Sequence, residues 1–147
     1  MSYSQIRVLV WSERTEPADV YPDGINGAIA AALKKDKKLA VRTAQLSDPD
    51  SGVSDATLDA TDVLIWFGHQ KHNEVSPEVI ARIVRHVKEK GMGYLPVHSS
   101  HFALPFKAVL DEIQKAPELL PAIKRSVDRH RSPGRFPGGP LRPRLAR

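Results

Sequence analysis

The sequence predicts an α/β protein built as a three-layer sandwich around a mostly parallel sheet. Four short apolar runs have the length and composition of strands, and segments with helical spacing lie between most of them. This alternation is typical of parallel strands joined by right-handed helical crossovers. The 147 residues form one domain, which is long enough for an ordinary core but short for a complete doubly wound sheet.

Each element has its own local signal. Helix starts are marked by the turn Tyr21-Pro-Asp-Gly24 and by Ser76-Pro77, and Gly91 ends the second helix. His86 lies within that helix, at a position that we expect to be solvated. The strands are expected at residues 6–11, 39–44, 63–67 and 94–97. The helices are expected at residues 25–33, 76–90 and 104–113.

Two histidine pairs follow the third and fourth strands. In the flavodoxin-like strand order 2-1-3-4, the first, third and fourth strands are neighbours, and ligands bind beyond their carboxyl ends. We therefore expect Glu13 to converge there with the pairs His69/His72 and His98/His101. Pro96 within the fourth strand lacks an N–H, which predicts a bulge or an early end to pairing.

The histidine pairs allow two kinds of chemistry. Neutral imidazole is a frequent metal ligand and a frequent general base. In one hypothesis a divalent metal such as Zn²⁺ is held by these side chains, with Glu13 or Glu74 as an oxygen ligand or base. In the other, two histidines act as acid and base without a metal. The residues do not decide between them, and we favour the metal-assisted version, with the ligands His69, His72, His98 and His101.

Charge and composition exclude several classes of function. Of the 22 lysines and arginines, six arginines lie in residues 129–147, which leaves 16 against 17 acidic residues in residues 1–128. The folded part therefore gives no electrostatic reason to expect a nucleic-acid partner. The chain has no cysteine and no apolar run of membrane-spanning length, so we expect a cytoplasmic protein without a membrane partner.

Four motifs in order resemble the trehalose-utilisation (ThuA) family, over about residues 5–110. They are Trp11-Ser-Glu13, Val20-Tyr-Pro-Asp-Gly-Ile-Asn26, Asp62-Val-Leu-Ile-Trp-Phe-Gly-His-Gln-Lys-His72-Asn-Glu-Val75 and Val97-His-Ser-Ser-His-Phe102. The resemblance implies a flavodoxin-like fold related to class I glutamine amidotransferases. It also implies carbohydrate metabolism, in which a 3-keto-disaccharide is processed by cleavage of its glycosidic bond.

Position near the predicted site and side-chain chemistry suggest roles for individual residues. His69, His98 and Glu13 are the expected catalytic groups, and Trp11, Tyr21 and Ser99 are the expected contacts to a small sugar substrate. His98 stands where the amidotransferase relatives carry their nucleophilic cysteine, so amidotransferase chemistry is excluded. Self-association into a homo-oligomer is left open.

The resemblance stops near residue 110, where family members continue with further strands. We interpret this as a frameshift or truncation, which leaves the sheet incomplete at the C-terminus. The expected organisation is one domain over residues 1–128 and a disordered Arg/Pro-rich tail over residues 129–147. The alternative function is then a catalytically inactive remnant that only binds or oligomerises.

Overall fold

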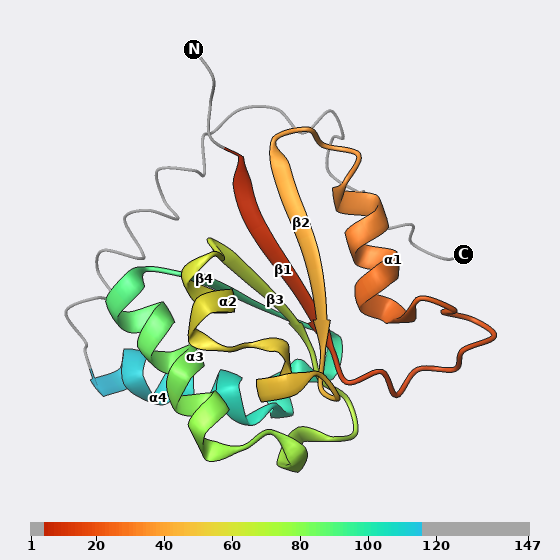
Figure 1. Cartoon of the computed structure of the whole chain (residues 1–147). Coiled ribbons are helices and arrows are strands. Elements are labelled where there is room, and N and C mark those ends of the chain that lie inside the picture. Colours follow the sequence, from red (N-terminus) through yellow and green to blue (C-terminus); the bar gives the residue numbers. More distant parts are fainter. Residues whose placement is uncertain (1–4, 116–147) are drawn as a thin grey trace, which may run out of the picture. The chain divides into compact units, whose positions relative to one another are not determined.

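A computed structural model describes residues 5–115, which form an α/β fold with an all-parallel, four-stranded sheet (Figure 1). The strand order is β2-β1-β3-β4, which confirms the predicted flavodoxin-like order. The strands are β1 (Ile6–Ser12), β2 (Leu39–Gln45), β3 (Val63–Phe67) and β4 (Gly93–Val97). The helices are α1 (Gly24–Leu33), α2 (Asp55–Asp59), α3 (Pro77–Lys90) and α4 (Leu104–Lys115), with short 3₁₀ turns η1 (Pro49–Gly52), η2 (His72–Glu74) and η3 (His98–Phe102).

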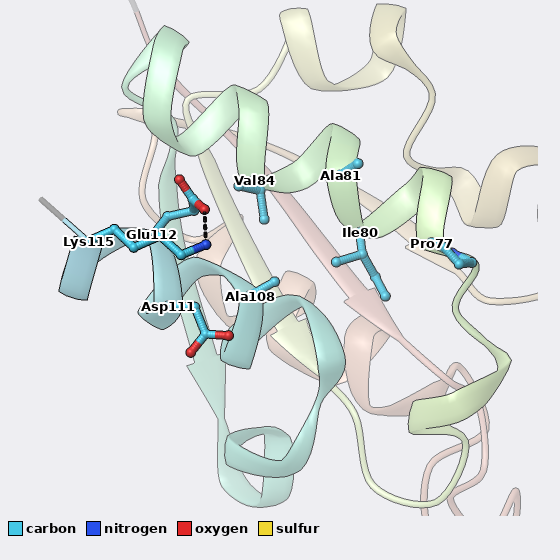
Figure 2. Close-up of a pocket in the computed structure, with 8 residues that line it drawn as sticks. All are labelled: Pro77, Ile80, Ala81, Val84, Ala108, Asp111, Glu112 and Lys115. Carbon is cyan, nitrogen blue, oxygen red and sulfur yellow. Dashed lines mark hydrogen bonds and ion pairs between the residues drawn. The ribbon is translucent and has the colours of Figure 1, made fainter.

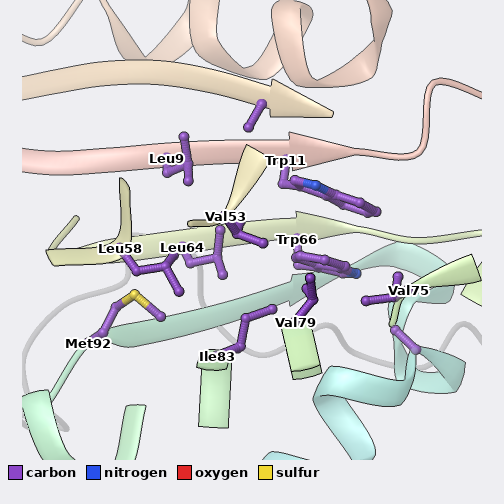
Figure 3. Packing of buried hydrophobic residues seen from close by; sticks show 12 residues of the cluster. Leu9, Trp11, Val53, Leu58, Leu64, Trp66, Val75, Val79, Ile83 and Met92 are labelled. Atoms are coloured by element: carbon purple, nitrogen blue, oxygen red, sulfur yellow. The ribbon is translucent and has the colours of Figure 1, made fainter. Parts of the chain in front are cut away.

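Helices cover the two faces of the sheet to make the three layers. Helix α1 lies against one face, and α2, α3 and α4 lie on the other (Figure 1). Alternate residues of β1 supply the two cores, with Val8 and Val10 facing α1 and Leu9 and Trp11 facing α3. The larger core stacks Trp11 on Trp66, with ring centroids 3.5 Å apart (Figure 3).

The predicted disturbance at Pro96 is absent. Strand β4 pairs with β3 in unbroken register, with Trp66 opposite Pro96 and Phe67 opposite Val97. In the described part of the sheet β4 is an edge strand, where a missing N–H is tolerated. The expectation of a bulge or early end to pairing was therefore wrong.

Helix α3 begins and ends as its sequence predicts. The Ser76 hydroxyl accepts a hydrogen bond from the Val79 N–H at 3.3 Å, and Pro77 occupies the first helical position. Gly91 takes a left-handed conformation, with φ of 71°, where a side chain would be strained. These local signals place the loop that precedes the helix, and that loop carries His69 and His72.

The expectation that His86 is solvated was wrong. Its side chain is 2% exposed, and the ring packs between helices α3 and α2. Its Nδ1 lies 2.9 Å from the Arg82 carbonyl oxygen, and its Nε2 lies 3.2 Å from Asp59 Oδ1. The spacing contained the signal, because His86 follows the buried Val79 and Ile83 by seven and three residues and shares their helix face.

An ion pair at the amino end of the sheet predicts a loss of stability in acid. Arg7 Nη2 lies 2.6 Å from Asp62 Oδ1, and this partner lowers the pKa of Asp62 to about 2. A lowered carboxyl pKa stabilises the fold above its ordinary value of about 4, and the contribution is lost as pH falls through about 2. Because both groups are half exposed, we expect Asp62→Asn to cost at most about 1 kcal/mol at pH 7.

Urea unfolding of the native protein and Asp62→Asn at several pH values measures this contribution. The difference in unfolding free energy should be largest near neutral pH and should shrink towards zero near pH 2. Asp36→Asn, which alters an exposed carboxylate in a different turn, is the control for general acid effects. A difference for Asp62→Asn that is constant from pH 7 to pH 2 would contradict the expectation.

Candidate functional site

The candidate site lies at the carboxyl edge of the sheet, beyond β1, β3 and β4. Because β3 is paired in parallel with both of its neighbours, the segments that follow the three strands emerge at one edge. Glu13 follows β1, His69 and His72 follow β3, and His98 and His101 follow β4. In the structure, His69 of the first pair lies beside His98 of the second pair.

His69 and His98, the first histidines of the two pairs, both contact the Ser99 hydroxyl. Nδ1 of His69 lies 2.7 Å from Ser99 Oγ, and Nδ1 of His98 lies 3.1 Å from the same atom. The two ring centroids are 5.8 Å apart, and both rings lie beside Phe67. Both histidines are exposed, so their outer nitrogens are open to a ligand from solvent.

Two serines connect the turn after β4 to the end of β3 through hydrogen bonds. The buried Ser100 hydroxyl accepts from the Gly68 N–H at 2.7 Å and donates to the Trp66 carbonyl oxygen at 2.8 Å. The Ser99 hydroxyl donates a hydrogen bond to the Gly68 carbonyl oxygen at 3.1 Å. Sequence reasoning did not find the structural role of Ser100, since a serine in a turn follows no periodic pattern that would reveal its partners.

His98 has an unusual backbone conformation. Its φ is 55°, in the left-handed region that non-glycine residues seldom adopt and that costs about 1–2 kcal/mol. Backbone strain of this kind is concentrated at functional sites, where the surrounding structure maintains it. Here the serine contacts on either side of Gly68 hold the turn, and His98 stands next to Ser99.

The second histidine of each pair lies near Phe102. The ring centroids of His72 and Phe102 are 6.4 Å apart, and those of His101 and Phe102 are 4.0 Å apart. His72 is largely buried, with its Nδ1 3.8 Å from Glu13 Oε1, whereas His101 is exposed. Phe102 itself is 55% exposed and forms an aromatic surface beside His72 and His101.

Glu13 supports the loop and does not face solvent. Its side chain is 1% exposed, and its Oε2 accepts a hydrogen bond from the Gln70 N–H at 2.7 Å. Its other oxygen faces His72, so both oxygens act on the loop over residues 68–72. The catalytic role of Glu13 stays a prediction, and in this structure its buried carboxylate contacts the loop and not solvent.

The predicted zinc ligands do not point at one position. His69 and His98 turn their Nδ1 atoms to Ser99, His72 faces Glu13, and His101 packs on Phe102. Within residues 5–115, no three histidine, aspartate or glutamate side chains are arranged to hold a metal ion. The proposal of zinc stays a prediction that metal analysis can test.

The predicted substrate contacts have different environments. Trp11 is fully buried under Trp66, and its Nε1 donates to the Ser51 carbonyl oxygen, so its ring is not available to a sugar here. Tyr21 is exposed and opens the predicted turn, with its carbonyl oxygen accepting from Gly24 N–H. The Ser99 hydroxyl is engaged by protein atoms.

A separate hollow of about 300 Å³ lies between α3 and α4 (Figure 2). Apolar side chains of α3, among them Ile80 and Val84, form one wall, and Glu112 and Lys115 of α4 pair at 2.9 Å on the other. The lining contains no histidine and no hydroxyl side chain. The hollow therefore does not belong to the predicted site.

The comparisons with known proteins leave the family open. A scan against protein-family models found no match, and neither did a search of curated proteins. Among the described residues, none of the helices has both the length and the apolar character that crossing a membrane requires.

Proposed function

We propose that the protein processes 3-keto-disaccharides such as 3-keto-trehalose, and that it cleaves the glycosidic bond by acid–base chemistry of His69 and His98. The observation that carries the proposal is the meeting of these two exposed imidazoles at one serine hydroxyl. The substrate class comes from the resemblance of the histidine motifs to the trehalose-utilisation family. The location beyond the carboxyl ends of parallel strands agrees with where α/β folds bind ligands.

The chemistry suits a pair of neutral histidines. A ketone at C3 of the sugar acidifies the hydrogen on C2, so a general base can remove it. The electron pair of that bond then forms a C1=C2 double bond while the bond from C1 to the glycosidic oxygen breaks. A general acid protonates the departing oxygen, and the second sugar leaves as an alcohol.

Two rings about 6 Å apart can reach both the C2 hydrogen and the glycosidic oxygen of such a substrate. The ring centroids of His69 and His98 are 5.8 Å apart, and the reacting hydrogen and oxygen are held by adjacent carbons. The exposed ring of Phe102, which lies beside His72 and His101, offers a sugar an aromatic surface that sequence reasoning did not single out. Apolar ring faces commonly pack on the carbon–hydrogen faces of their ligands.

Incubation with 3-keto-trehalose tests the proposal. We expect release of glucose and of the unsaturated 3-keto sugar, which becomes 3-keto-glucose when water adds across its C1=C2 double bond. Chromatography with mass detection measures these products. Trehalose, which lacks the ketone, should not be cleaved because its C2 hydrogen is not acidic. Cleavage of both sugars at equal rates would contradict the elimination chemistry, and cleavage of neither would remove the proposed activity.

A binding protein without turnover is the second candidate. Leu95 on the edge strand β4 is 51% exposed, although parallel strands are usually covered on both faces. An exposed apolar edge favours a surface that takes up a partner or a second copy of the chain. Sugar binding by calorimetry, with no product formed, would favour this candidate over the enzyme.

A further inference from the structure

Three polar atoms surround a small space beside Gly68, just after β3. A side-chain carbon added there would lie 3.2 Å from His72 Nδ1, 3.2 Å from Trp66 Nε1 and 3.3 Å from Glu13 Oε1. The Glu13 side chain is 1% exposed, and His72 Nδ1 is buried without a hydrogen-bond partner among the described residues. Buried polar atoms nearly always have a partner, so the facing of these groups calls for a specific assignment of their protons.

The chemistry of the three atoms places a proton on His72 Nδ1. The Trp66 Nε1–H group can only donate, and an ionised carboxylate can only accept. Glu13 Oε2 already accepts from the Gln70 N–H at 2.7 Å, so Oε1 is the oxygen that faces the ring. An unprotonated Nδ1 would turn its lone pair towards a buried negative charge, which is unfavourable.

The distance between the two groups is compatible with this assignment. Nδ1 lies 3.8 Å from Glu13 Oε1, which is longer than a hydrogen bond. A full charge at this distance still orients an N–H dipole, because electrostatic interactions are stronger in a buried setting than in water. Glu13 therefore selects the Nδ1–H tautomer of the neutral ring.

This tautomer leaves His72 Nε2 as a hydrogen-bond acceptor. The side chain is 17% exposed, and since Nδ1 is buried, Nε2 is the one ring nitrogen through which His72 can meet a ligand. In a neutral ring with its proton on Nδ1, Nε2 is unprotonated. Through the ring, the buried carboxylate thus decides what kind of hydrogen bond His72 offers.

An aromatic ring and a cation lie near this acceptor. The ring centroid of the exposed Phe102 is 6.4 Å from that of His72, and Lys107 Nζ is 5.9 Å from the Phe102 centroid. Lys107 is exposed, and its ammonium group can donate to hydroxyl oxygens. A sugar ring matches this set, because its hydroxyls both donate and accept and its carbon–hydrogen face is apolar.

We propose that His72 and Phe102 form a sugar-binding subsite, in which His72 Nε2 accepts a hydrogen bond from a hydroxyl of a sugar ring packed on Phe102. Glu13 is a positioning residue that fixes the tautomer of His72. The subsite rests on the proposed function for its ligand, a glucosyl ring of the disaccharide. Its two residues share turns with the reacting pair, since His72 follows His69 after β3 and Phe102 ends the η3 turn that His98 begins.

One substitution should reverse the tautomer. In Glu13→Gln the single amide oxygen is needed by the Gln70 N–H, so the amide NH₂ group takes the place of Oε1 and faces His72. We expect the Nδ1–H form of His72 in the native protein and in the control Glu89→Gln, which neutralises an exposed carboxylate near the end of α3. We expect the Nε2–H form in Glu13→Gln.

Long-range proton–nitrogen spectra of the full-length ¹⁵N-labelled protein distinguish the two forms, and His72→Gln identifies the signals. EDTA in the sample keeps metal ions off the ring. An Nε2–H form of His72 in the native protein, or the same tautomer in native protein and Glu13→Gln, would overturn the role of Glu13.

Binding of trehalose tests the subsite itself. Trehalose has the same kind of glucosyl ring without the ketone, so the proposed chemistry predicts binding without cleavage. We expect trehalose to shift the Nε2 signal of His72. In calorimetry, His72→Leu should bind trehalose about 10-fold more weakly, as for one lost hydrogen bond, and Phe102→Leu about 3- to 10-fold more weakly. Glu89→Gln should bind like the native protein.

The outcomes separate the subsite from the proposed function. An Nε2 signal that trehalose does not move, or an affinity that neither His72→Leu nor Phe102→Leu lowers, would overturn the subsite even in a protein that cleaves 3-keto-trehalose. Trehalose binding that depends on both residues, in a protein that does not cleave 3-keto-trehalose, would support the subsite and overturn the proposed function alone.

Discussion

Replacing His98 by glycine is expected to reduce the turnover of 3-keto-trehalose by about 10²–10⁴-fold, the usual contribution of a positioned general acid or base. The substitution removes the imidazole whose Nδ1 lies 3.1 Å from Ser99 Oγ. The proposed chemistry needs one ring for the C2 hydrogen and another for the glycosidic oxygen, and His69 alone cannot serve both. One of the two proton transfers would then depend on water.

The same substitution separates loss of chemistry from loss of fold. The φ of His98 is 55°, a conformation that glycine adopts without a steric penalty. His98→Gly should therefore keep the unfolding free energy of the native protein or raise it by about 1 kcal/mol. Kinetics and urea unfolding of the same preparation measure both quantities.

Comparison variants sharpen the interpretation. His69→Ala should lower turnover by a similar factor, and the double variant should be little worse than either single one, because residues that act as a unit are not additive. Lys71→Ala, which removes an exposed side chain from the same loop, should turn over like the native protein. Full turnover by both His98→Gly and His69→Ala would defeat the proposed site.

The sheet could be predicted because its signals are local and periodic. The apolar runs of β1 and β3 are recognisable by composition, and the caps of α3 come from Ser76, Pro77 and Gly91. General rules of handedness and strand order then supply the topology. The tail predicted over residues 129–147 lies outside the described residues, as do residues 116–128.

The arrangement of the site could be predicted only in outline. The rule for parallel strands brings the histidines to one edge, but side chains in turns follow no fixed period. Whether His69 meets His72 or His98 therefore depends on the turn geometry that Ser99 and Ser100 impose. Burial of Glu13 and Trp11 has the same origin, because only the packed structure shows which polar and aromatic groups the loops cover.

Trp66→Ala is expected to lower the unfolding free energy by about 3–5 kcal/mol, as is usual for large aromatic residues in a core. Trp66 is 1% exposed and stacks on Trp11 with an interplanar angle of 8°. Its removal loses apolar burial, leaves a cavity and breaks an aromatic pair. For a domain whose total stability is about 5–15 kcal/mol, this is a large part of the whole.

Unfolding is easily followed, because Trp11 and Trp66 are the two tryptophans of the chain and both report on the same core. In the variant, Trp11 fluorescence and far-ultraviolet circular dichroism should give one common, lowered urea midpoint. Tyr94→Phe is the matched control, since burial raises the Tyr94 pKa and its hydroxyl lacks a partner among the described residues. Removing that hydroxyl should leave stability unchanged or raise it. If Trp66→Ala cost no more stability than Tyr94→Phe, the stacked tryptophan pair would not be holding β1 to β3. Other contacts would then have to support the turns that carry the histidines.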